Sequence, residues 1–114
     1  MKIISLSDIT EEGISHNPEI KKKVMIRRGE IPYITNFSQA NFKPGQTSGQ
    51  HIHENLYEVF LVEEGEGTIC IENTEYYVRK GFCVVAEPGE MHNIINTTQS
   101  DFVITYFGLK AEKK

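Results

Sequence analysis

The stretch that decides the fold runs from residue 45 to residue 65 and reads Gly45-Gln46-Thr47-Ser48-Gly49-Gln50-His51-Ile52-His53-Glu54-Asn55-Leu56-Tyr57-Glu58-Val59-Phe60-Leu61-Val62-Glu63-Glu64-Gly65. Residues 59–62 are apolar at every position, and a glycine lies at each end of the whole stretch. A β-branched and aromatic run between turn residues predicts a β-strand, here at residues 57–62. The carboxylate of Glu58 opens that run, where burial without a partner is costly.

Similar short runs recur along the chain, separated by segments rich in Gly, Pro, Asn or Asp. Separators of this composition are typical of tight β connections. No long segment has helical periodicity, so we predict an all-β sandwich or barrel. The nine expected strands cover residues 24–28, 33–42, 50–53, 57–62, 68–71, 75–78, 82–86, 91–95 and 102–107.

The length of 114 residues fits one domain. We expect residues 1–20 to be an irregular N-terminal arm, in which Gly13 and Pro18 limit any helix to one turn at residues 10–12. Residues 21–114 then form a single barrel domain. Several strands are apolar on both faces, which favours a homodimer in which a second subunit covers the outer face.

Charge and hydropathy exclude several kinds of partner. The net charge is -4 and the pI is near 5.5, so we expect no binding to nucleic acid. The basic residues at 21–28 are expected to be the solvated ends of a strand or a lysine-protected sheet edge. No segment has the apolar length of a membrane span or a signal peptide, which predicts a cytoplasmic protein that does not contact a membrane.

The two cysteines, Cys70 and Cys83, both lie in apolar runs. We expect them to be buried, reduced thiols. A disulfide between neighbouring strands is the alternative.

Three histidines and Glu58 have the chemistry of a metal site. His51 and His53 are two residues apart, which in a strand places both imidazoles on one face. His92 follows a turn that contains Gly89 and opens another expected strand. Three imidazoles and one carboxylate suit Fe(II), Mn(II), Ni(II), Zn(II) or Cu(II). Each of these residues alone is also compatible with an ordinary surface or core position.

The joint pattern of these residues resembles the cupin superfamily. The first motif of that family has its counterparts, without departure, in Gly45, His51, His53, Glu58 and Gly65. The second motif is matched by Gly81, Gly89, His92 and Asn96. Two positions depart from it: the proline comes one place late, as Pro88, and Phe82 stands where the family usually has Asp.

The resemblance implies a conical antiparallel β-barrel of the jelly-roll type with about nine to ten strands. It also implies that His51, His53, Glu58 and His92 hold one divalent transition metal per chain, with Fe(II) or Mn(II) favoured and Ni, Zn or Cu possible. We expect Gly65, Gly81 and Gly89 to serve tight turns that need positive φ. Asn96 is expected to cap a turn with its side chain.

The expected metal site leaves three functions open. The first is a small-molecule oxygenase, such as a dioxygenase, whose substrate chelates the metal and which needs no further protein base. The second is an isomerase, epimerase or lyase, for which Tyr57, Tyr106 or His16 is a weak candidate for the base. The third is a barrel that binds a small ligand without catalysis. In each case we expect a small organic, anionic ligand, because the site is cationic and open.

The lining of the cavity follows from strand alternation. Phe60 and Val62 share a face with Glu58, and Ile94 shares one with His92. We therefore predict an apolar pocket beside the metal. An outward-facing Phe60 would contradict this prediction.

Overall fold

The computed structural model describes residues 1–111. One short 3-10 helix, η1 (Leu6–Asp8), is followed in the described chain by nine strands. They are β1 (Glu12–Gly13), β2 (Lys21–Ile26), β3 (Phe37–Phe42), β4 (Leu56–Glu64), β5 (Glu66–Ile71), β6 (Thr74–Arg79), β7 (Cys83–Ala86), β8 (His92–Ile95) and β9 (Phe102–Lys110).

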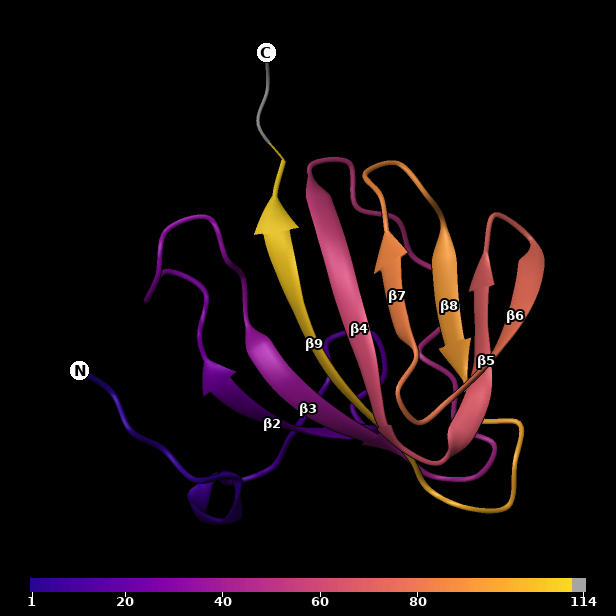
Figure 1. The fold of residues 1–114 in the computed structure, drawn as a ribbon, viewed down its shortest axis with the longest axis horizontal. Coiled ribbons are helices and arrows are strands. Elements are labelled where there is room, and N and C mark those ends of the chain that lie inside the picture. The colour runs from indigo at the N-terminus through magenta and orange to yellow at the C-terminus, as the bar shows by residue number, and fades with distance from the viewer. Residues whose placement is uncertain (112–114) are drawn as a thin grey trace.

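The strands form two antiparallel sheets (Figure 1). The larger sheet has six strands in the order β1-β2-β3-β9-β4-β7, and the smaller has three in the order β6-β5-β8. This arrangement confirms the predicted all-β jelly-roll fold and its approximate number of strands. It is compatible with a barrel.

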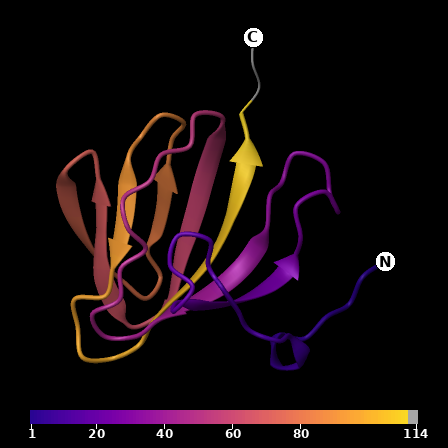
Figure 2. The same cartoon turned by 180° about the vertical axis from the view of Figure 1, so that it is seen from behind.

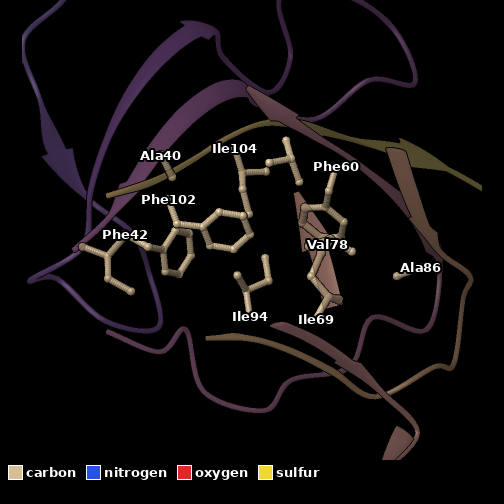
Figure 3. Packing of buried hydrophobic residues seen from close by; sticks show 11 residues of the cluster. Ala40, Phe42, Phe60, Ile69, Val78, Ala86, Ile94, Phe102 and Ile104 are labelled. Atoms are coloured by element: carbon tan, nitrogen blue, oxygen red, sulfur yellow. The ribbon is translucent and has the colours of Figure 1, made fainter. Parts of the chain in front are cut away.

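The core lies between the two sheets, where Figure 3 shows Phe60, Phe102 and Ile104 facing Ile69 and Ile94. Strand alternation creates it. On β4, Phe60 and Val62 are buried whereas Tyr57 and Leu61 are exposed. Burying one large apolar side chain of this kind contributes about 1.5–3 kcal/mol to folding.

Turn chemistry connects the strands as expected at the predicted glycines. Gly65, Gly81 and Gly89 have φ angles of 77°, 93° and 84°. At Gly65, between β4 and β5, a Cβ atom would also collide with the carbonyl of Asp101. Asn96 is 1% exposed. Its side-chain amide donates hydrogen bonds to the carbonyls of Phe42 and Ser100, and so connects the end of β3 with the turn before β9. Its predicted capping role is confirmed.

The structure corrects several expected strand bounds. Residues 50–53 are not a strand: Gly49 adopts a φ of 80°, and only His51 pairs with β8. β2 begins at Lys21 rather than at residue 24, because Lys21 to Lys23 pair with β3. β3 begins at Phe37 rather than at residue 33, after Tyr33 adopts a φ of 73°.

The arm and the cysteines also differ from expectation. The helical turn lies at Leu6–Asp8, whereas Glu12 and Gly13 pair with β2 as β1. Both cysteines are free thiols, but neither is buried: Cys83 is exposed and Cys70 is half-buried. On β7, Ala86 faces the core and Cys83 lies on the outward set of alternating positions.

Candidate metal centre

The candidate metal centre is assembled from three segments. Glu58 projects from β4, and His92 is the first residue of β8. His51 and His53 lie on the loop between β3 and β4, which runs beside β8 (Figure 2). The backbones of His51 and His92 exchange two hydrogen bonds of 3.0 and 2.9 Å, and the amide of Gly89 donates to the carbonyl of His53. The loop is thereby held against β8.

The four side chains converge on one point. One potential ligand atom from each residue lies within 4.8 Å of all the others. The Glu58 Oε1 atom is 2.8 Å from His92 Nε2, 3.1 Å from His53 Nε2 and 3.7 Å from His51 Nε2. The structure thus brings together all four residues that the sequence singled out.

Backbone carbonyls orient two of the imidazoles. His51 Nδ1 lies 3.1 Å from the carbonyl oxygen of Gly49, and His92 Nδ1 lies 3.0 Å from that of Glu90. A carbonyl only accepts, so each Nδ1 carries the proton and donates. A neutral ring of this tautomer has its lone pair on Nε2, the atom that would bind a metal. Without a metal, His92 Nε2, 2.8 Å from Glu58 Oε1, donates to the carboxylate when the ring is protonated.

The electrostatics of the group favour an ionised carboxylate. Burial raises the pKa of Glu58, but the surrounding imidazoles of His51, His92 and His53 outweigh burial and bring it to about 2. Burial lowers the pKa of His53, which keeps that imidazole neutral. Burial also acts to lower the pKa of His92, but hydrogen bonding to Glu58 and to the Glu90 carbonyl raises it overall.

These donors fit a divalent transition metal. Three imidazoles and an ionised carboxylate are a common ligand set for Fe, Mn, Ni, Zn or Cu. A cation bound between the Glu58 carboxylate and the three imidazoles would be attracted to all four groups. The set could therefore hold a metal ion, and no cysteine belongs to it.

A cavity of about 170 Å³ opens beside the four residues. Phe60 and Ile94 line it, which confirms their predicted orientation, whereas Val62 is buried in the core and is not part of the lining. The cavity is less apolar than expected. Polar side chains also line it, namely Ser15, His16, Lys22, Arg28, Thr35, Asn36, Ser48 and Tyr106.

Two basic side chains on the cavity wall were not predicted from the sequence. Lys22 and Arg28 were expected to be solvated strand ends, but both line the cavity. A signal for Lys22 was present in the sequence. Lys22 lies two residues before the apolar Val24, which is buried, and therefore shares its face of the strand. No comparable signal marks Arg28, which lies beyond the end of β2.

The three candidate bases lie in different places. Tyr57 is 38% exposed on the outer face of β4 and does not line the cavity, because it alternates with Glu58. Tyr106 lines the cavity, and burial, together with the charge of Glu58, raises its pKa to about 12. The His16 ring stacks on His51 with their centroids 4.3 Å apart, and burial lowers its pKa.

Comparison with known proteins agrees with this architecture. The Cupin domain family model matches residues 38–107, more than half of the chain. A curated protein of Thermotoga maritima, named oxalate-binding protein, is 29% identical over 109 residues, covering 87% of this chain and 86% of that protein.

Solved structures share the fold. A Thermotoga maritima crystal structure described as a predicted oxalate decarboxylase has a TM-score of 0.89 and 23% identity, covering 96% of this chain and 99% of that one. A Silicibacter pomeroyi structure described as a sugar phosphate isomerase has a TM-score of 0.82 and 18% identity, covering 95% and 75%. At these identities the likeness concerns the fold alone. The family match over residues 38–107 establishes that the chain belongs to the cupin domain family.

Proposed function

We propose that the protein binds one Fe(II) or Mn(II) ion through His51, His53, Glu58 and His92, and acts as an oxygenase on a small organic acid that chelates the ion. The observation that carries this proposal is the convergence of three imidazoles on one carboxylate. When bound, the metal would supply open coordination positions for the acid and one-electron chemistry.

The side chains of the site have separate roles in this proposal. The carbonyls of Gly49 and Glu90 hold His51 and His92 in the tautomer that presents Nε2. Glu58 supplies the negative charge. Phe60 and Ile94 form an apolar wall that limits water beside the bound acid.

Charge favours an anionic ligand. A divalent ion and one carboxylate leave a net charge of about +1 at the centre, since the imidazoles are neutral. A relative named oxalate-binding protein supports a small dianion of this kind as the ligand. Oxalate is therefore the first probe to test.

A second candidate function is binding without turnover, which the name of that relative favours. A non-redox isomerase, epimerase or lyase has less support because it requires a base. Tyr57 faces outward, and Tyr106, with a pKa of about 12, stays protonated at neutral pH. Of the three candidates only His16 remains.

The metal site is tested by elemental analysis of the purified, untagged protein and of two variants, His51→Ala and His92→Ala. We expect about one transition-metal ion per chain in the wild type and its loss from both variants. His16→Ala is the matched control, because it removes an imidazole that touches His51 but is not a ligand. Full occupancy in either ligand variant would contradict the assignment.

The reaction is tested next on the metal-loaded protein. Oxygen consumption with Fe(II) or Mn(II) and oxalate, hydroxy acids or diketones would support an oxygenase. Tight binding of the same acids without oxygen uptake would favour the binding function instead.

We further propose that the protein is a homodimer in the cytoplasm. Leu61, Val85 and Leu109, on β4, β7 and β9, are 39%, 49% and 43% exposed on the outer face of the larger sheet. An uncharged apolar face of this kind is suited to a second copy of itself. Light scattering should give a dimer for the wild type and a monomer for Leu61→Glu.

The proposed cytoplasmic location is supported by the cysteines. The free thiols of Cys70 and Cys83 are typical of a reducing compartment.

A further inference from the structure

The basic run at residues 21–28 delivers two cations to the cavity. Lys22 lies on β2 opposite Ala40, and both side chains line the cavity. Its neighbours are engaged elsewhere: the ammonium groups of Lys21 and Lys23 donate to the carbonyls of Pro18 and Leu6. Arg28, just beyond β2, lines the same cavity. Side chains alternate along β2, so Lys22 faces the cavity whereas Lys21 and Lys23 bond to the N-terminal arm.

Neither cation forms an ion pair in the described part of the chain, residues 1–111. The acid opposite Lys22 is Glu12 on β1, but its carboxylate is held by Arg27 at 2.6 Å. Glu58 is the one acidic residue that lines the cavity in the described chain, and its Oε1 atom is shared by the imidazoles. No ion pair therefore neutralises Lys22 or Arg28 where they line the cavity. Lys22 is partly balanced by Glu12, whose pKa is lowered first by the hydrogen bond from Arg27 and to a smaller extent by the charge of Lys22.

These charges change what the cavity can bind. The centre carries about +1 when a divalent ion is bound, and the two side chains add two positive charges. A chelating monocarboxylate neutralises only the charge of the metal centre and leaves the charges of Lys22 and Arg28. A ligand that covered Lys22 and Arg28 without meeting their charge would remove solvation from them at a cost.

Lys22 is well separated from Glu58 in the larger sheet. The strand order β2-β3-β9-β4 sets two strands between β2 and β4. Lys22 lines the cavity from β2. Arg28 lies just beyond β2 and nearer the metal site, since its charge, after the larger effect of burial, helps to lower the pKa of His53. A cavity of about 170 Å³ is smaller than the ~300–1,000 Å³ of sites for drug-sized ligands, so it suits an acid of a few carbon atoms.

We propose that Lys22 and Arg28 form an anion-recognition wall, and that the preferred ligand is a chelating acid with a second carboxylate directed away from the metal. This inference rests on the proposed function and specifies its ligand as a short dicarboxylate with an oxygen-chelating head. Arg28 suits this role because a guanidinium binds a carboxylate through two parallel hydrogen bonds.

Lactate and malate form a matched pair of probes, because malate is lactate with an added carboxylate on its methyl group. We expect isothermal titration calorimetry of the Mn(II)-loaded protein to show malate binding about 10- to 100-fold more tightly than lactate. In the double variant Lys22→Gln/Arg28→Gln, malate should bind only as well as lactate does. Lactate affinity itself should stay within about threefold of the wild type.

Lys21→Gln is the matched control, since it removes the same charge from the adjacent position on β2. It should keep the preference for malate. Manganese content and circular dichroism are measured first for each variant, so that a lost preference is not a lost metal or a lost fold. Because Arg28 is exposed, Arg28→Gln provides a second variant that should leave folding unchanged, and it should lose part of the preference.

The outcomes separate the two proposals. Equal binding of both acids by the wild type, or an unchanged preference in the double variant, would overturn the anion-recognition wall and leave the metal-chelating site standing. Binding of neither acid by the fully loaded wild type would overturn both.

Discussion

The two walls of the cavity are built in opposite ways. On one wall, β4, β8 and the loop at residues 51–53 hold four side chains that touch one another and are fixed by backbone hydrogen bonds. On the other wall, Lys22 extends from β2 and Arg28 from the segment just beyond it, and neither forms an ion pair within residues 1–111. The arm brings His16 to the first wall, where its ring stacks on that of His51.

The difference indicates a division of work. Metal binding needs donor atoms at fixed positions, because coordination geometry tolerates little displacement. Recognition of a charged group tolerates more, because a long cationic side chain adjusts to its partner. We therefore expect changes on the first wall to act on the metal and changes on the second to act on the ligand.

The largest effect should come from Glu58→Gln, which keeps the shape of the side chain and removes its charge. Removing one member of a half-buried charged cluster costs about 3–4 kcal/mol, so metal affinity should fall roughly 100- to 1,000-fold. Competition with a chelating dye measures it. Lys22→Gln, on the second wall, should leave metal affinity within about threefold. Equal losses in both variants would break the distinction between the walls.

Metal addition should sharpen the same contrast in the wild-type protein. At a free metal concentration of 100 times Kd, binding stabilises the fold by about 2.7 kcal/mol, which raises Tm by about 10 °C in a domain of this size. Hydrogen exchange should slow at the amides of His51 and His92, which bond each other across the loop and β8. The amide of Gly13 in β1 should change much less. Uniform protection would contradict the expectation.

Gly13→Ala should disturb the arm alone. A Cβ atom at residue 13 would lie 2.6 Å from the carbonyl oxygen of Pro18, so the turn that brings His16 to the cavity must shift. Overpacking of this kind costs about 1–3 kcal/mol, which urea unfolding measures. Metal affinity should stay near the wild-type value. Ser15→Ala, at an exposed position of the same turn, is the control and should unfold like the wild type.

The metal wall could be predicted from the sequence because its signals are local. The spacing of His51, His53 and Glu58, and the positive φ at Gly65 and Gly89, are properties of short segments. The prediction of a strand at residues 50–53 was nevertheless wrong. The spacing of His51 and His53 is also compatible with a loop that pairs with β8 at His51 alone, and such a loop still directs both imidazoles to Glu58.

The second wall could not be predicted in the same way. Alternation assigns Lys22 to the face of Val24, but it does not say which strands lie across a cavity from each other. That depends on the sheet order, which brings β2 beside β3 and β9 beside β4. The same limit applied to Tyr106, which is placed beside Phe60 by the register of β9 on β4. Tyr57, by contrast, is next to Glu58 on β4, so alternation alone places it on the other face.

The smallest effect should come from Tyr106→Phe, which tests whether the phenol on the cavity wall contacts the bound acid. Loss of one hydrogen bond of about 0.5–1.5 kcal/mol predicts a fall in oxalate or malate affinity of about 2- to 12-fold, while Tyr57→Phe changes nothing.

The pKa of Tyr106 is raised to about 12, above the value near 10 of an unfolded chain. The fold therefore favours the neutral phenol, and the stability it contributes is complete below pH 10 and lost between pH 10 and 12. Absorbance titration of the phenolates should show one ionisation near pH 12 that Tyr106→Phe removes. If that ionisation persisted in the variant, another tyrosine would be the buried one, and Tyr106 would lose its place on the wall.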